Sequence, residues 1–544
     1  MTNASTVRVR RSILDLQNEY DRGNRKPLED VIRAWKGIQE LPPTDKRSFF
    51  ILGGYHGEPF NYRGAVDALS PTDIYTYWGG WCNHGNVLFP TWHRMYLYKL
   101  EEALRTIVPD VTLPFWDETS EDALKNGIPR VLTQESFELD GVVIKNPLHS
   151  FKLPQALSDD LPGDNQVYVK PAGYETVRYP LSGLVGTPEA RAATEAHNRQ
   201  FPDAEQNVKL LNQNVVAWLQ GGNPTPTHPN PTGNGVAAMF SNCLKAPNYT
   251  VFSNTTSAAQ WGLDHPGTVV PLEQPHNDIH LSVGGFDLPG QFESGQIADA
   301  NGDMGENNTA GLDPIFFFHH CNIDRMFWIW QKQHGATDQL SVIPGYPGTN
   351  SSDSQGPTPG IPPGTALDLN TPLNPFVKDE FGSICTSMDC TNIETQLHYT
   401  YGPGSFDDGI TQVAAPDTTG RKLTVRGIDR ALFEGSFVVS AHAKVTSDTG
   451  AITDYYLGSH SVLSRRNVVK CANCLTHLEV IAHFPLDGVP AADVDKAQFT
   501  IAIQHRGSTK QLPGGATVNL LSMHAGRRLA PLPAKLKFTA AVRA

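Results

Sequence analysis

Several features are scarce in this sequence of 544 residues. It has 7 cysteines, too few for a disulfide-stapled scaffold, and the odd count leaves at least one without a cysteine partner. No apolar run reaches the roughly 18 residues of a membrane-spanning helix, so none is expected. Positive charge is also in short supply. The formal net charge of -13 argues against nucleic acid as a partner.

The N-terminal residues contain no apolar segment of the kind that marks a secretion signal. Arg10 and Arg11 form a twin-arginine pair, which a Tat signal would also contain, but a mixed, helix-like sequence follows them. We therefore expect a cytoplasmic protein, with no membrane partner. The sequence leaves the oligomeric state open.

The chain divides into two parts of different character. Its first part has helix-like patterns between Pro/Gly-rich loops, and five apolar residues recur at the spacing of one buried helix face: Leu28, Val31, Ile32, Trp35 and Ile38. Helices are also expected over 94–107 and 315–331. Near the C-terminus, short β-prone runs predict a β-sandwich. We expect a mainly α domain over 1–402, a linker over 403–425 and a β-sandwich over 426–544.

Histidines gather in short segments of the first part. His56 lies in YHGEPF, and CNHGNVLFPTWHR contains His84 and His93. We expect His93 to open a helix that begins near Thr91, with His84 on the loop before it.

A second group of histidines follows. In HNDIH, the i, i+4 spacing places His276 and His280 on one helix face. DPIFFFHHCNIDR supplies the adjacent pair His319 and His320. Neighbouring helical residues point about 100° apart, so only one of this pair should bind a metal.

Two sets of three imidazoles predict a metal centre. The alternative is a set of unrelated core histidines, because a single buried histidine is most often a hydrogen-bonded structural residue. Zinc competes for an HxxxH motif, but zinc hydrolases place a glutamate after the first histidine, where this chain has Asn277. Imidazole-rich sites with open positions suit copper.

These segments resemble the motifs of the tyrosinase, catechol oxidase and molluscan haemocyanin superfamily. CNHGNVLFPTWHR is similar to the first copper motif, and HNDIH with DPIFFFHHCNIDR to the second. The resemblance implies a central four-helix bundle holding two copper ions, with small phenols as substrates and dioxygen as co-substrate. Three histidines would bind each copper: His56, His84 and His93 for one, and His276, His280 and His320 for the other. His319 would turn to neighbouring polar groups.

The resemblance also implies a covalent bond near the first copper. Cys82 would form a thioether with His84, and the alternative is a plain buried thiol. Phe89 and Phe316 would pack against ligand rings, which ordinary core packing would also place there.

Polar residues around the ligands are expected to orient them. Asp313 and Asp324 are candidates for these hydrogen bonds, and Arg325 would pair with an acid. Glu273 and Asn277 match the glutamate and asparagine that hold a water able to accept the phenol proton in the family. The alternative role for Glu273 is a favourable charge at a helix N-terminus.

The same comparison bears on the reaction. Asn307 falls roughly where some relatives place a bulky aromatic residue, which leaves room for a monophenol ring, and Leu281 would contact that ring. These residues favour a tyrosinase, which hydroxylates monophenols and oxidises o-diphenols to o-quinones. A catechol oxidase without hydroxylase activity and a haemocyanin-like oxygen carrier are the alternatives.

The β-sandwich contains Cys471 and Cys474 in CANC. A lone CxxC fits a surface disulfide, a redox pair or half of a zinc site. The resemblance to long fungal-type tyrosinases implies copper delivery instead, and soft thiolates favour Cu(I).

In such long forms the C-terminal domain plugs the active-site entrance, usually with an aromatic side chain, and keeps the enzyme latent. Leu463 stands at the matching position, and Tyr455, Tyr456 and His460 are alternatives.

The end of the catalytic domain is also expected to be tied to its beginning. Arg8 or Arg10 would pair with Tyr399 or Tyr401 ahead of the linker.

Overall fold

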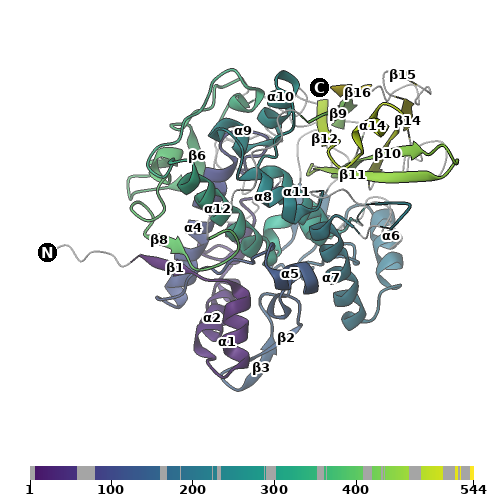
Figure 1. Cartoon of the computed structure of the whole chain (residues 1–544). Coiled ribbons are helices and arrows are strands. Elements are labelled where there is room, and N and C mark those ends of the chain that lie inside the picture. The colour runs from purple at the N-terminus through teal and green to yellow at the C-terminus, as the bar shows by residue number, and fades with distance from the viewer. Residues whose placement is uncertain are drawn as a thin grey trace.

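Three buried helices lie at the centre of the helical region in the computed structural model (Figure 1). They are α4 (Phe89–Ile107), α11 (Glu273–Gly284) and α12 (Ile315–Gln333), and α12 packs against both of the others. All of α11 is buried, as is α12 from Ile315 to Gln331. A helix covered on every side belongs to the core of a large domain, so side chains on these helices face one another in a dry interior.

Shorter helices surround this centre. α2 (Lys26–Glu40) packs against α4 and buries the predicted apolar face. α4 begins at Phe89, earlier than the expected start near Thr91. The remaining helices of this region are α1 (Ile13–Asp21), α3 (Phe49–Gly53), α5 (Glu121–Asn126), α6 (Pro188–Asn198), α7 (Ala204–Gln220), α8 (Val236–Cys243), α9 (Tyr249–Ser253) and α10 (Thr255–Asp264).

Short two-stranded ladders also lie in the helical region. β1 (Arg8–Arg10) pairs in parallel with β8 (Tyr399–Tyr401), which joins the beginning of this region to its end. The other pairs are antiparallel: β2 (Ser136–Leu139) with β3 (Val142–Lys145), β4 (Leu157–Asp159) with β5 (Tyr168–Lys170), and β6 (Pro372–Val377) with β7 (Ile384–Thr386).

Among the described residues, the C-terminal region forms two sheets (Figure 1). Their buried side chains make an apolar core separate from that of the helical region. One sheet has the order β11-β10-β13-β14-β15 and the other β12-β9-β16. The strands are β9 (Lys422–Asp429), β10 (Phe437–Thr446), β11 (Ile452–Val462), β12 (Glu479–Pro485), β13 (Gln498–His505), β14 (Leu521–His524), β15 (Arg527–Arg528) and β16 (Thr539–Arg543), with the short helix α14 (Ala491–Val494). β9 spans the boundary expected at residue 426.

The structure describes residues 7–57, 80–159, 168–183, 185–222, 225–229, 234–286, 288, 302–351, 360–362, 364–407, 420–430, 433, 435–464, 479–505, 521–524, 527–528 and 539–543. Within these ranges, no helix combines the length and apolar character needed to cross a membrane.

Candidate metal centre

The first histidine cluster consists of His56, His84 and His93. His56 follows α3, His84 lies on the loop before α4, and His93 is in the second turn of α4. One ring nitrogen of each lies within 4.8 Å of the others, and all three residues are buried. Burial, followed by the neighbouring His84 and His93 rings, holds the pKa of His56 well below its usual value. Burial lowers the pKa of His93 to about 3, so the rings of His56 and His93 are neutral near pH 7.

Backbone carbonyls orient two rings of this cluster. His93 Nδ1 lies 2.8 Å from the Phe89 carbonyl oxygen one turn earlier, and His56 Nδ1 lies 3.2 Å from that of Asn307. A carbonyl oxygen only accepts, so each Nδ1 carries the hydrogen and each Nε2 presents a lone pair. Both Nε2 atoms are buried and have no hydrogen-bond partner among the described residues.

The second histidine cluster consists of His276, His280 and His320. Nε2 of His320 lies 3.1 Å from Nε2 of His276 and 3.1 Å from Nε2 of His280. His276 Nδ1 lies 2.9 Å from Asn277 Oδ1, and His280 Nδ1 lies 2.9 Å from the Met304 carbonyl oxygen. The Nε2 atoms of His276 and His280 therefore present lone pairs to the same point.

A cation placed between these three nitrogens would satisfy all of their lone pairs at once. A hydrogen on His320 Nε2 could satisfy one of the two facing lone pairs, and the other would still face a nitrogen. Nitrogens bound to one ion at about 2 Å are separated by roughly 3 Å, which matches the 3.1 Å spacing found. The residues present fit a metal ion.

Glycines allow the Met304 carbonyl to reach His280. A Cβ added at Gly284, the end of α11, would lie 1.6 Å from the backbone nitrogen of Gly305. Only a residue without a Cβ allows these two segments to approach so closely. The close contact brings the 303–305 turn against α11 and fixes the tautomer of His280.

His319, beside His320, belongs to the same group of buried ring nitrogens but has a different partner. Its Nδ1 lies 2.5 Å from Glu118 Oε1. Burial lowers the pKa of His319 to about 3 and raises that of Glu118 well above its usual value. The sequence did not single out Glu118. The expectation that His319 turns to a polar neighbour agrees with this contact.

Two aromatic rings bridge the clusters. Phe316 stacks on His320 with ring centroids 3.9 Å apart and meets His56 edge-on at 4.8 Å. Phe89 lies 4.8 Å from both His93 and His276. Each phenylalanine thus contacts one histidine from each cluster, as its predicted packing role requires.

The clusters are direct neighbours. His93 and His320 stack with centroids 4.6 Å apart, and His84 lies 5.7 Å from His276. No carboxylate joins either group of candidate ligand atoms among the described residues. Two adjacent, buried, nitrogen-only sites suit a pair of copper ions. This geometry, in a helical core, defines a type-3 dicopper protein.

Comparisons with known proteins agree. Residues 46–333 match the common central domain of tyrosinase. The chain is 69% identical to a tyrosinase of Hahella sp. over 100% of both chains, and 42% identical to one of Aspergillus oryzae over 94% of this chain and 95% of that one. The structure of a Burkholderia thailandensis tyrosinase matches with a TM-score of 0.84 and 61% identity, covering 98% of this chain and 100% of the other. The chain belongs to the tyrosinase family.

Glu273 and Asn277 lie in α11 beside the second cluster. Glu273 is fully buried, and its Oε1 accepts from the Gly85 N–H at 2.7 Å. Its Oε2 accepts from Thr255 N and Oγ1 at 2.8 and 3.0 Å. Burial raises the pKa of Glu273, and the Thr255 and Gly85 donors oppose that rise. Glu273 therefore also holds the loop that carries His84.

The other predicted neighbours of the metals are buried as well. Cys82 lies on the loop of His84, and its Sγ accepts from the Gly57 N–H at 3.4 Å; the thioether stays a prediction. Leu281 is fully buried. Asn307 contributes its backbone carbonyl to His56, a contact that side-chain reasoning did not foresee.

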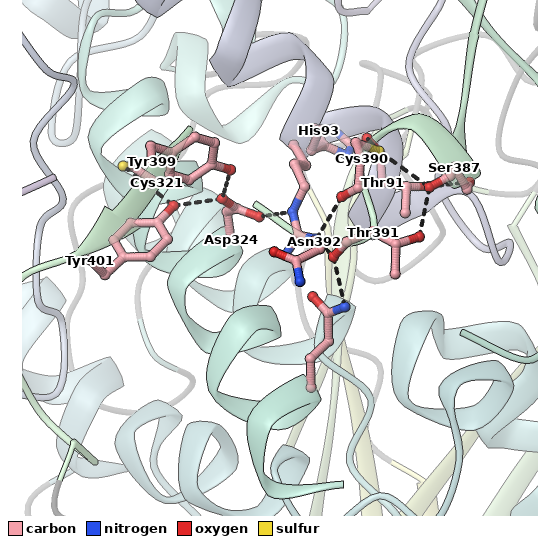
Figure 2. A network of polar contacts seen from close by, with 12 residues as sticks. Thr91, His93, Cys321, Asp324, Ser387, Cys390, Thr391, Asn392, Tyr399 and Tyr401 are labelled. Atoms are coloured by element: carbon pink, nitrogen blue, oxygen red, sulfur yellow. Dashed lines mark hydrogen bonds and ion pairs between the residues drawn. The ribbon is translucent and has the colours of Figure 1, made fainter. Parts of the chain in front are cut away.

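Asp324 has partners other than the ligand rings it was expected to orient. Its carboxylate accepts from Arg94 Nε at 2.6 Å, Tyr399 OH at 2.5 Å and Tyr401 OH at 2.6 Å (Figure 2). Arg10 NH1 donates to Tyr401 OH at 3.1 Å. Asp324 faces the side of α12 where β1 and β8 meet, so this network confirms the expected link between Arg10 and the two tyrosines.

The related expectations for two neighbours have different outcomes. Asp313 accepts from Arg178 Nε and NH2 at 2.9 and 2.6 Å, so it too bonds an arginine and not a ligand ring. Arg325 pairs with an acid as predicted, its NH2 lying 2.6 Å from Asp407 Oδ1.

Replacing Asp324 by asparagine should destabilise the protein by about 3–5 kcal/mol, because it leaves the buried Arg94 charge without its carboxylate. Urea unfolding of the metal-free protein measures this loss. The exposed pair of Asp21 and Arg130 provides the control, and Asp21→Asn should cost about 1 kcal/mol or less. Equal midpoints for the two variants would contradict the assignment.

Leu463 contacts the helical region. It follows β11, is fully buried and belongs to the apolar core of the helical region, whereas the preceding Val462 belongs to the core of the β-sandwich. Cys471 and Cys474 lie outside the described residues, so copper delivery stays a prediction.

Proposed function

We propose that this chain is a tyrosinase that hydroxylates monophenols at the ortho position and oxidises o-diphenols to o-quinones, with dioxygen as co-substrate. The first histidine cluster would hold one copper ion and the second cluster the other. When bound, the copper pair supplies the redox chemistry with dioxygen. The observation that supports this proposal most directly is the convergence of three imidazole nitrogens at 3.1 Å with their lone pairs facing inwards.

The protein itself orients the histidine rings, excludes water from the site and provides a base. Asn277 Oδ1 and the carbonyls of Met304, Asn307 and Phe89 fix which nitrogen each ring presents. The phenylalanines on the rings exclude water. We assign Glu273 and Asn277 to hold a water that accepts the proton of a monophenol, with the Glu273 carboxylate as the base that polarises this water. A phenol pKa near 10 leaves few molecules ionised at pH 7.

The C-terminal region is proposed to keep the enzyme latent. Leu463 reaches into the helical core, and Asn277 Nδ2 makes a long contact of 3.5 Å to the Ser461 carbonyl oxygen. Lys422 of β9 donates to the carbonyl oxygens of His265 and Gly267, just beyond α10, at 2.6 and 2.5 Å. A cation suits the C-terminal end of a helix, so this contact supports docking of the β-sandwich. The cytoplasmic location stays a prediction.

Replacing His320 by alanine should reduce the bound copper from two equivalents to one, because a two-nitrogen site holds the ion weakly. His319→Gln should keep both equivalents at saturating copper, since its Nδ1 is bonded to Glu118. Metal analysis of the purified variants measures this. Loss of copper from the His319 variant alone would reverse the ligand assignment.

Turnover of tyramine and of 4-methylcatechol by the copper-loaded wild type then separates the activities. Oxidation of both compounds supports a tyrosinase. Oxidation of the catechol alone would identify a catechol oxidase, and binding of copper without either turnover would point to a fully shielded enzyme or an oxygen carrier.

A further inference from the structure

A buried carboxylate lies next to the second histidine cluster without touching any of its ring nitrogens. Glu118 is fully buried, and its Oε1 lies 2.5 Å from Nδ1 of His319. Its Oε2 accepts from Asn322 Nδ2 at 3.2 Å. Burying a carboxylic acid is costly unless its hydrogen bonds are satisfied, and both oxygens of Glu118 have a partner on α12.

The His319 ring packs on two proposed ligands. Its centroid lies 5.3 Å from that of His276 with nearly parallel planes, and 5.2 Å from that of His280 with planes at 83°. His276 is thereby held on three sides: by His319 on its face, by Phe89 at 4.8 Å and by the Asn277 oxygen at Nδ1. Rotation of the His319 ring would disturb both neighbours.

His319 could also disturb the site in a second way. It stands next to His320 and belongs to the same group of candidate ligand nitrogens. A histidine free to rotate there could compete with His320 for the ion. The contact with Glu118 commits Nδ1 of His319 to a hydrogen bond and prevents that rotation.

We propose that Glu118 is a positioning residue for the second copper site. It acts through His319, which it holds in the orientation that packs against His276 and His280 and that leaves His320 as the third ligand. Carboxylates that orient metal ligands through a hydrogen bond commonly change metal affinity 10–100-fold when replaced. Here the oriented histidine is a neighbour of the ligands and not itself one. This inference rests on the proposed function.

The test measures release of copper from the full-length, copper-loaded protein to a Cu(I) chelator under reducing conditions. In Glu118→Gln, one of the two equivalents should leave about 10–100-fold faster than in the wild type, while the other keeps its rate. Glu118→Leu should show a larger effect on the same equivalent, because it removes the hydrogen bond altogether.

Glu101→Gln is the matched control. Glu101 is equally buried and bonded to Arg10 Nε at 2.8 Å, in the network away from the histidines. It should lower the urea midpoint of the metal-free protein without creating a fast copper equivalent. The proposal is overturned if both copper equivalents leave faster in Glu118→Gln. It is also overturned if Glu118→Gln lowers the urea midpoint but leaves copper release unchanged. A wild type that binds no copper would instead defeat the proposed function.

Discussion

Replacing Leu463 by alanine should raise phenol turnover by the full-length protein at least thirtyfold or so, because emptying a buried leucine site costs about 2–5 kcal/mol and each 1.4 kcal/mol is a factor of about ten. Leu463 is fully buried in the apolar core of the helical region. Truncating it therefore destabilises the closed arrangement, and the population of the open one rises in proportion. The separate core of the β-sandwich, which does not include Leu463, stays intact.

Val462→Ala is the matched control for this change. Val462 is the adjacent residue, is 3% exposed and packs into the β-sandwich. It should lower the stability of the sandwich and leave turnover close to that of the wild type. Tyramine and 4-methylcatechol turnover at equal copper content measures both variants. If the two variants activate the enzyme equally, general loosening of the C-terminal region, and not removal of a plug, is the cause.

Local patterns in the sequence predicted the parts of the fold that repeat along one element. The buried face of α2 and the i, i+4 pair His276 and His280 follow directly from the helical period. The 100° turn between neighbours predicted that only one of His319 and His320 binds a metal, and the resemblance to the copper motifs selected His320. β9 carries no such period, because its first four residues are all buried and its last four are mixed.

Contacts between segments far apart in the chain could not be predicted from the sequence. Glu118 and His319 are 201 residues apart, and no spacing rule links them. The orientation of His280 depends on the backbone carbonyl of Met304, which any residue type could supply. Asp324 was expected to orient ligand rings, but its carboxylate bonds Tyr399 and Tyr401 instead. Sequence identifies such polar residues more readily than their partners.

Replacing Glu273 by glutamine should slow monophenol hydroxylation by about a hundredfold or more, the usual contribution of a general base, and slow diphenol oxidation less. Both oxygens of Glu273 accept hydrogen bonds, from Gly85 on one side and Thr255 on the other. The amide nitrogen of glutamine would face an N–H group in either orientation, which costs about 1–3 kcal/mol. Because Gly85 follows His84, some loss of diphenol oxidation is expected too. Equal loss of both activities would remove the assignment of Glu273 as the base.

Thr255→Val separates the base from the structural role of Glu273. It removes one donor to Oε2, the hydroxyl at 3.0 Å, and keeps the carboxylate and its backbone donors. A carboxylate that loses a hydrogen bond to its charged form has a higher pKa, on top of the rise that burial already causes. A base works only when deprotonated, so monophenol hydroxylation should fail at a higher pH as the solution is acidified.

In Thr255→Val, the pH at which diphenol oxidation falls on acidification should not change, since that reaction does not need this proton acceptor. Thr255→Ser keeps the hydroxyl and should leave this pH unchanged for both reactions. The measurement is the pH profile of tyramine and of 4-methylcatechol turnover for the three proteins. Suppose that the pH profile of hydroxylation does not shift in Thr255→Val, or that the profiles of both reactions shift together. The Glu273 carboxylate would then hold the His84 loop without taking the phenol proton.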